Sequence, residues 1–507
     1  MSAPADRLSP APDAAATGAL LRLVPSLPLF VGLAAFARAV ADRSALLNDP
    51  DTYLHIAAGR WMLAHGSLPL ADPFSHTMPG AAWLASEWLG ELTMALTYAV
   101  GGWSGVAALA AATFALALAL LTGFLLRRLD PLPALTGAVA AMALLLPHLL
   151  ARPHILALPL LVWWSGALLA ARDAGRGPPF RLLAVMLLWA NLHASFMFGL
   201  ALAGFLAAEA AWQPGPGRSR FAEMRRWGGF VATAIVVALV TPNGIAGLVQ
   251  PFRLVTMPAL HASFIEWLPP DFARFAALEV WLFGLIALGF WLRARLPLPR
   301  LLLLLLLLHM ALRHARHADL LAVVAPLAMA AALGPALAAC LPASGISGLG
   351  RTLARLARPA GLAAVAATLA LAAMLAAPLF VYPIHRGDDT VTPASALAAA
   401  KRLELAAGDH SSKLFNGESF GGYLAFAGIP AFIDGRAEMY GNDFLANYLS
   451  AERGDPAALP ALLAQYRVGW TLLPPSVGAV AALDRLPDWH RVYADDWAVI
   501  HARDAAP

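Results

Sequence analysis

The chain has 507 residues, of which 60% are hydrophobic and only 13% are charged, and its formal net charge is +4. This composition excludes an ordinary soluble domain, in which about a quarter of the residues are charged. The charge does not indicate a nucleic-acid partner, because most of the arginines lie in short loops between apolar segments, where they mark membrane topology.

The single cysteine, Cys340, lies in an apolar segment. It excludes an internal disulfide and argues against a metal site built from cysteines. The first apolar segment is followed by acidic and aromatic residues and not by a cleavage site of small residues. We therefore expect this segment to be a retained helix and not a signal peptide.

Apolar segments close to the roughly 20 residues that a spanning helix needs predict about eleven membrane helices. Their bounds are expected to be accurate only to within several residues. In chain order, the helices are expected near residues 22–41, 103–126, 133–150, 155–171, 182–195, 196–212, 228–248, 276–292, 299–314, 318–340 and 361–382.

Five loops that carry arginines set the expected orientation. By the positive-inside rule these loops lie in the cytoplasm, as does the N-terminus with Arg7 and Arg22. The odd number of helices then places the C-terminus outside. The five loops are residues 127–128, 172–181, 218–226, 293–300 and 351–358.

Residues 83–100 form a helix-like apolar segment that carries Glu87 and Glu91. If this segment crossed the membrane, the loop with Arg127 would fall outside, against the positive-inside rule. We therefore expect a helix that lies in the outer interface, with its acids toward water or a site. A short true span is the alternative.

Composition divides the chain into two parts. Residues 1–382 hold the membrane helices, with a long first outer loop at 42–102, and residues 383–507 lose the apolar runs. The second part alternates strand-like and helical segments, which is typical of a small α/β domain. Its expected strands are Pro430–Asp434, Gly469–Leu473 and Trp497–His501, and its expected helices are Ser395–Leu405 and Ala457–Gln465. The predicted fold is thus an α-helical polytopic membrane protein with a small extracytoplasmic α/β domain.

The first outer loop carries the first candidate site. Asp49 and Asp51 flank Pro50, and Asp51, His55 and Gly59 follow at four-residue steps, so they can share one helical face. A carboxylate here can accept a proton from an incoming hydroxyl group, as a general base does. The alternative is that Asp51 caps the N-terminus of the following helix.

Further along the same loop, Asp72, His76 and Glu87 are candidates for an acceptor or loop site. Asp72 precedes a proline, so it can equally be explained as the start of a turn.

The tips of three predicted helix pairs carry a third group of candidates. Arginine suits phosphate oxygens because its donors form a planar fork, and histidine can add a charge-assisted bond. The alternative is that these side chains only anchor helices at the outer interface. A divalent metal is a further possibility, although no tight ligand motif is present. The candidates are Arg152, His154, His193, Arg313, His314, Arg316 and His317.

The last candidates lie in the C-terminal part. Asp434, Arg436 and Glu438 stand at the end of the expected strand Pro430–Asp434, and binding residues often lie at the carboxyl ends of strands in α/β sheets. The alternative is a turn at Gly435 that is held by an Asp–Arg pair.

This pattern resembles GT-C-type membrane glycosyltransferases, which include protein mannosyltransferases, aminoarabinose transferases and the catalytic subunits of oligosaccharyltransferases. The family's hallmark is an acidic motif in the first outer loop, matched here by Asp49-Pro50-Asp51. The resemblance implies that Asp49 or Asp51 is the catalytic base. It also implies that outer arginines hold the phosphate of a polyprenyl-phosphate-linked sugar, and the candidates for this role are Arg152, Arg313 and Arg316.

A weaker resemblance to oligosaccharyltransferase catalytic subunits lies in SFGGYL (419–424) followed by FIDGR (432–436). In that family a WWDYG motif precedes a strand that ends in Asp-Asn. The Trp-Trp-Asp is absent here, so protein N-glycosylation is not assigned.

The predicted function is transfer of a sugar from a polyprenyl-phosphate carrier to a glycan, lipid or protein acceptor of the cell envelope. The resemblance places the reaction at the periplasmic face of a bacterial inner membrane. An O-antigen-type polymerase or ligase is one alternative. A transporter or flippase for a lipid-linked substrate is another, but transporters tend to show internal repeats and polar residues at the midplane, and this sequence shows neither.

Overall fold

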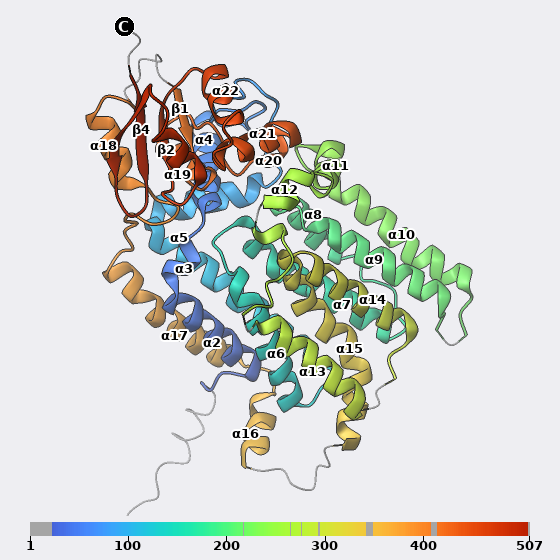
Figure 1. Cartoon of the computed structure of the whole chain (residues 1–507). Coiled ribbons are helices and arrows are strands. Elements are labelled where there is room, and N and C mark those ends of the chain that lie inside the picture. Colours follow the sequence, from blue (N-terminus) through green and yellow to red (C-terminus); the bar gives the residue numbers. More distant parts are fainter. Residues whose placement is uncertain are drawn as a thin grey trace, which may run out of the picture.

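A bundle of helices carries a small mixed domain at one end (Figure 1). The computed structural model describes residues 23–504 except 216, 264, 275, 293–294, 341–347 and 407–412. The expected placement of Arg7, Arg22 and Arg293 lies outside the described residues. The end of the bundle that carries the domain is called the domain side below, and the other end is called the opposite side.

Most of the predicted membrane helices lie within a few residues of their expected bounds. In the described part of the chain, five helical segments are long and apolar enough to cross a membrane: residues 88–125, 131–148, 153–173, 315–340 and 362–381. The prediction of a polytopic helical membrane protein with a small C-terminal α/β domain is confirmed. The helices that match predicted ones are α2 (Leu27–Ala41), α6 (Pro131–Leu145), α7 (Pro153–Asp173), α8 (Leu182–Leu192), α9 (Phe196–Trp212), α13 (Ala277–Leu292), α14 (Leu298–Arg313), α15 (Ala318–Cys340) and α17 (Leu362–Val381). A short helix that was not predicted, α16 (Gly348–Leu356), overlaps the expected loop at 351–358.

The predicted helix 228–248 is wrong in its bounds. The chain forms α10 (Arg220–Ala238) and α11 (Gly244–Val255), separated by a turn that contains Pro242. Proline lacks a backbone N–H and disfavours the helical conformation of the residue before it, so the apolar run is interrupted there.

Helix α5 (Trp88–Leu125) turns sharply at Gly102, whose φ of 56° and ψ of −149° are not helical. A Cβ added at Gly105 would lie 2.8 Å from the carbonyl oxygen of Thr97, whereas eight residues of straight helix would separate the two by about 12 Å. The part that ends at Gly101 also contacts Phe380, near the C-terminal end of α17. Both ends of residues 88–101 thus lie at the domain side, which favours the interfacial helix over a short span.

The first loop forms α3 (Arg43–Leu47) and α4 (Pro50–His65). The side chain of Asp49 accepts a hydrogen bond of 2.8 Å from the backbone N–H of Asp51, and Pro50 follows at the first helical position, where its missing N–H is not needed. The N-cap of α4 is therefore Asp49. The alternative that Asp51 is the cap is wrong, and the carboxylate of Asp51 remains available for other contacts.

The C-terminal domain is built on a four-stranded sheet in the order β1-β2-β4-β3. β1 and β2 are parallel and the other pairs are antiparallel. The expected strands at 469–473 and 497–501 correspond to β2 and β4. The strands are β1 (Lys413–Asn416), β2 (Val468–Leu473), β3 (Trp489–Ala494) and β4 (Val499–Arg503), and the helices are α18 (Ala394–Arg402), α19 (Glu418–Phe426), α20 (Ala437–Tyr440), α21 (Asn442–Glu452), α22 (Ala458–Gln465) and α23 (Gly478–Leu483).

The predicted strand Pro430–Asp434 is wrong. Only Ala431 forms a β-bridge there, with Ser75 of the first loop. The side chain of Asn416 makes the backbone hydrogen bonds that a neighbouring strand would otherwise make. Its Oδ1 accepts from the N–H of Phe432 at 2.7 Å, and its Nδ2 donates to the carbonyl of Ile433 at 2.9 Å. The segment is thus held between the first loop and the end of β1.

The domain packs on the first loop through backbones that approach each other closely. A Cβ added at Gly422 of α19 would collide with the carbonyl oxygen of Pro50, and one added at Gly435 would collide with the carboxylate of Asp51. Beside this contact the ring of Tyr53 meets those of Tyr423 and Phe426 edge to face, at 5.2 and 5.3 Å between centroids. Packing thus fixes the domain against the start of α4.

The substitution Gly422→Ala is expected to weaken this docking, because its methyl group has no room against Pro50. We expect the protein to be destabilised by about 1–3 kcal/mol, the usual cost of overpacking. Thermal unfolding in detergent measures this effect. The control is Gly387→Ala, where an added Cβ meets nothing within 4 Å. Equal melting temperatures for the two variants would contradict the packing described.

Candidate functional site

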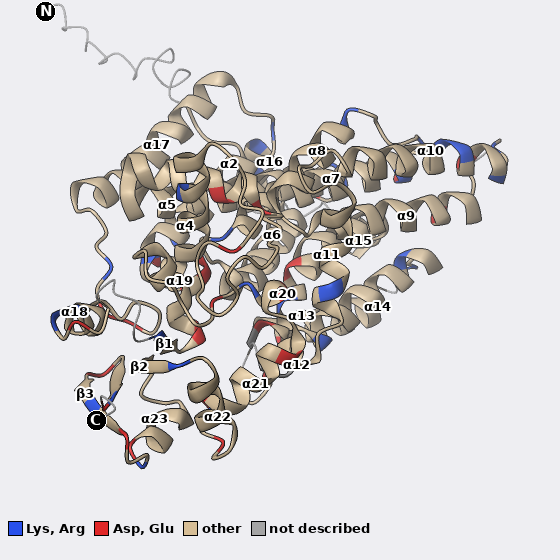
Figure 2. Ribbon diagram, turned by 90° about the horizontal axis from the view of Figure 1, so that it is seen from above, with Lys and Arg blue, Asp and Glu red and all other residues tan. Residues whose placement is uncertain are grey.

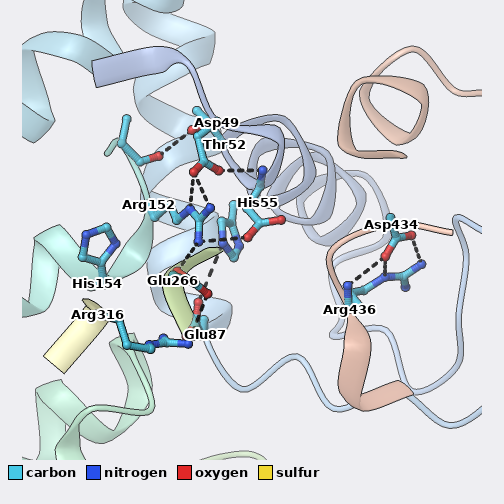
Figure 3. A network of polar contacts seen from close by, with 12 residues as sticks. Asp49, Thr52, His55, Glu87, Arg152, His154, Glu266, Arg316, Asp434 and Arg436 are labelled. Atoms are coloured by element: carbon cyan, nitrogen blue, oxygen red, sulfur yellow. Dashed lines mark hydrogen bonds and ion pairs between the residues drawn. The ribbon is translucent and has the colours of Figure 1, made fainter. Parts of the chain in front are cut away.

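Charged side chains from four parts of the chain meet where the domain and the first loop cover the bundle (Figure 3). Arg152 is at the centre. Its Nε donates to Oδ2 of Asp49 at 2.6 Å, and its Nη1 lies 3.2 Å from Oδ2 of Asp51 and 3.4 Å from Oε2 of Glu266. The structure thus brings together Asp49, Asp51 and Arg152, which the sequence predicted as catalytic and phosphate-binding residues.

Backbone contacts hold Arg152 in place. It is the N-cap residue of α7, directly before Pro153. The preceding residue, Ala151, donates its N–H to the carbonyl of Leu46 at 2.9 Å and accepts a hydrogen bond of 3.1 Å from the hydroxyl of Thr52. The turn before α7 is therefore hydrogen-bonded to Leu46, which precedes the acidic motif, and to Thr52, which follows it.

Glu266 extends the network to Arg316, whose Nη1 lies 3.2 Å from its Oε1. Glu266 lies in η2 (Ile265–Trp267), after α12 (Pro258–Ser263), and Arg316 lies in η3 (Ala315–His317). The guanidinium of Arg316 also stacks 4.5 Å from the ring of Trp267. Sequence reasoning missed Glu266. Its signal was an isolated acid beside a tryptophan, in a stretch between two apolar segments.

A second group of side chains surrounds His55. Its Nδ1 lies 3.4 Å from Glu91 and its Nε2 lies 3.8 Å from Glu87, while Nε2 of His193 lies 3.3 Å from Glu87. Burial lowers the pKa of His55, but the hydrogen bond to Glu91 and the charges of both glutamates outweigh burial and raise the pKa to about 9. Burial raises the pKa of Glu87 to about 7, although the charge of His55 acts in the other direction.

The two aspartates of the motif differ in exposure. The side chain of Asp49 is 2% exposed, and both its helix-capping contact and its ion pair with Arg152 use its oxygens. The side chain of Asp51 is 23% exposed. Burial raises the pKa of Asp51, the charge of Arg152 lowers it, and the charge of Asp49 raises it again, with the net shift upward. Asp51 is therefore the more exposed carboxylate of the motif.

The C-terminal domain adds further acids to this site. Burial, reinforced by the charge of Asp51, raises the pKa of Glu418 to about 8, and burial raises the pKa of Glu438 to about 7. Glu438 was a sequence candidate and Glu418 was missed. Seen from above, charged residues gather around α19, α20 and α12, while most helical ribbon is uncharged (Figure 2).

Asp434 and Arg436 lie to one side of the Arg152 network (Figure 3). Arg436 bonds Asp434 at 2.6 and 2.8 Å and Asp72 at 2.7 Å, and its guanidinium lies 4.7 Å from the ring of Trp83. Asp72 also accepts a turn hydrogen bond from the N–H of Phe74 at 2.9 Å. The alternative of a turn held by an Asp–Arg pair is thus what the structure shows, and the pair joins the domain to the first loop.

The remaining sequence candidates make contacts other than ion pairs with Arg152. The ring of His154 lies 6.2 Å from that of His193, whereas His76, His314 and His317 bond backbone carbonyls of Leu414, Trp267 and Met310. Within the described residues, Arg313 forms no hydrogen bond or ion pair with the network. In the same residues, no group of three or more His, Cys, Asp or Glu side chains is placed to hold a metal ion.

The pKa of His55 predicts how stability depends on pH. Because its folded-state pKa lies near 9, above its usual 6.5, the stabilisation from protonated His55 is complete below pH 6.5 and is lost as pH rises to 9. The free energy of unfolding should fall over this window by up to about 3 kcal/mol. Melting temperatures at pH 6.5 and 9 measure the fall. Between these two pH values, the melting temperature of His55→Gln should decrease less than that of wild type. The exposed His65 of the same helix is the control, since His65→Gln should keep the wild-type slope.

No protein-family model matches the chain, and no curated protein sequence is significantly similar to it. Solved structures resemble its overall fold. The archaeal oligosaccharyltransferase AglB from Archaeoglobus fulgidus, in complex with an inhibitory peptide and a dolichol-phosphate, has 13% identity and a TM-score of 0.48 over 88% of this chain and 69% of that chain. ArnT from Cupriavidus metallidurans, in the apo state, has 15% identity and a TM-score of 0.46 over 96% of this chain and 98% of that chain. Both are GT-C membrane glycosyltransferases, the family that the sequence resembles, and the likeness is one of fold.

Proposed function

We propose that the chain transfers a sugar from a polyprenyl-phosphate carrier to an acceptor of the cell envelope. The observation that carries this proposal is the array of Asp51, Arg152, Glu266 and Arg316 at the domain side of the bundle. It places a partly exposed carboxylate 3.2 Å from Arg152, and Glu266 connects Arg152 to a second arginine, Arg316. A carboxylate beside arginines suits a reaction with a hydroxyl nucleophile and a phosphate leaving group.

Asp51 is the proposed general base. As the acceptor oxygen forms its bond to the anomeric carbon, the hydroxyl proton passes to the carboxylate of Asp51, and the bond from the anomeric carbon to the phosphate oxygen breaks. The reaction inverts the anomeric configuration, because one displacement takes place on the side opposite the leaving group. The raised pKa of Asp51 makes its carboxylate a stronger base than an ordinary aspartate.

Arg152 and Arg316 are the proposed partners of the leaving phosphate. Arginine binds phosphate through parallel N–H donors, and fixed positive groups stabilise the charge that develops as the sugar departs. Glu266 contacts both arginines, at 3.4 and 3.2 Å, so we expect the phosphate to compete with this carboxylate. His154 and His193, whose rings lie 6.2 Å apart, both interact electrostatically with Arg152 and complete the proposed phosphate site.

The proposed setting is supported by the apolar helices and by the loops that carry arginines. Two of the segments that are long enough to cross a membrane, residues 153–173 and 315–340, begin at Arg152 and Arg316. A lipid-linked donor can therefore approach from the bilayer while its sugar reaches the domain side. We place the protein in a bacterial inner membrane, with the C-terminal domain in the periplasm. The acceptor is a glycan, a lipid or a protein of the envelope.

The first test is transfer by purified protein in lipid. The donors are radiolabelled polyprenyl-phosphate sugars, and the acceptor is an extract of envelope lipids and glycans. Asp51→Asn should lower transfer by about 10²–10⁴-fold, the usual contribution of a general base, while its melting temperature stays near that of wild type. Asp49→Asn should lower both activity and melting temperature, because Asp49 is the buried partner of Arg152.

Asp42→Asn is the matched control, because the side chain of Asp42 is exposed at the C-terminal end of α2 and, among the described residues, pairs with Arg38. It should keep full transfer. Wild-type transfer that Asp51→Asn leaves intact would remove Asp51 from the mechanism. If wild type transfers from no donor in the panel and binds none of them, the proposed function is wrong.

A second test compares two arginines that lie three residues apart. Arg316→Gln should weaken binding of the polyprenyl-phosphate donor by about tenfold or more, because a charge-assisted contact to phosphate is lost. Arg313→Gln should leave donor binding unchanged, since Arg313 is exposed and outside the network. Titration of labelled polyprenyl phosphate measures both constants. Equal affinities in the two variants would contradict the assignment of Arg316.

A further inference from the structure

A second polar site lies on the opposite side of the bundle, between α5, α7 and α15. A cavity of about 160 Å³ is lined there by Arg127, Arg128, Asp173 and Arg176 and, on its apolar side, by residues that include Leu327 and Ala330. Nothing in the proposed transfer reaction uses this cavity, since it lies at the far ends of the helices that begin at the candidate site.

The acids near this cavity already have partners. Nη2 of Arg300 lies 2.9 Å from Oδ1 of Asp173, and Glu209 is paired with Arg300 at 3.0 Å and with Arg172 at 3.1 Å. In the described part of the chain, by contrast, the three lining arginines form no ion pair with a carboxylate. The three lining arginines outnumber the one lining carboxylate, Asp173, which pairs with Arg300 and also interacts electrostatically with Arg128, so the lining carries a net positive charge.

Packing shapes the wall of the cavity. A Cβ added at Gly166 would lie 2.6 Å from the ring of Phe124, so the glycine lets this ring lie directly against α7. The guanidinium of Arg127 stacks 4.5 Å from the same ring, which orients it. Leu327 and Ala330 lie near the middle of α15. The cavity thus leads from an arginine-lined polar part to an apolar part between helices.

We propose that this cavity binds the phosphate ester of an anionic phospholipid. The arginines suit phosphate oxygens, and the apolar side at Leu327 suits the beginning of an acyl chain. The volume is well below the roughly 300–1,000 Å³ of a pocket for a whole small molecule, so it fits only part of a larger ligand. Basic pockets between transmembrane helices are a known kind of site for anionic lipid head groups.

The test is lipid binding by the full-length protein in detergent, followed by native mass spectrometry. Phosphatidylglycerol is the probe, and phosphatidylcholine, which carries no net charge, is the comparison. Wild type should bind phosphatidylglycerol with at least about tenfold higher affinity than the double variant Arg128→Gln/Arg176→Gln, which loses two charge-assisted contacts. Arg181→Gln removes an arginine from a neighbouring position that does not line the cavity, and it should bind like wild type.

A separate arm asks whether a soluble phosphate fills the same place. Inorganic phosphate at millimolar concentration should displace little phosphatidylglycerol, because it lacks the acyl chain. Full displacement would mean that the ligand is a soluble phosphate and would overturn the lipid assignment. Equal binding of phosphatidylglycerol by wild type and by the folded double variant, checked by its melting temperature, would also overturn the proposal.

Discussion

The ion pair between Arg152 and Asp49 is the interaction on which the candidate site depends. Asp49 has two roles at once, because it caps α4 and it orients the guanidinium of Arg152. Its side chain is almost fully buried, so loss of Arg152 leaves this carboxylate without its ion pair, which typically costs about 3–5 kcal/mol. The position of Asp51, one helical turn before His55, follows from this cap. The side chain of Asp49 therefore determines both where α4 begins and where the guanidinium of Arg152 lies.

The C-terminal domain forms part of the candidate site. Its glycines let α19 and the turn at Gly435 approach Pro50 and Asp51 without side chains between them. Arg436 donates hydrogen bonds to Asp434 within the turn, and its buried ion pair with Asp72 holds the turn to the first loop. The acids of the domain, Glu418 among them, reach the same space as the acids of the loop. A site of this kind is assembled only when loop and domain are both folded.

The sequence predicted the helices well because their signal is local. A run of apolar residues long enough to span a bilayer has few alternatives, and the arginines between the runs mark the turns. It also predicted that Asp49, Asp51 and Arg152 are candidates, since each is a polar residue at the end of an apolar run. Their mutual distances could not be predicted, because Arg152 follows Asp49 by 103 residues and only tertiary packing brings them together.

The failures have equally physical causes. The apolar segment 430–434 looked like a strand, but its hydrogen bonds go to the side chain of Asn416, a long-range contact with no local pattern. Glu266 was missed because one acid in an irregular loop carries no periodicity. Arg313 and Arg316 were equivalent in the sequence, and the end of α14 at Arg313, followed by the short turn of η3, separates them.

Ion pairs hold helix α7 at both ends, so its fit to the thickness of the lipid bilayer is constrained. Arg152 at its start is bonded to the first loop, and Asp173 at its end is paired with Arg300. Its 21 residues span about 31 Å, close to the roughly 30 Å hydrocarbon thickness of a typical bilayer. In a thinner membrane a helix of this length tilts, and in a thicker one the bilayer thins around it. Tilting of α7 moves Arg152 relative to the membrane surface, together with the first loop to which it is bonded.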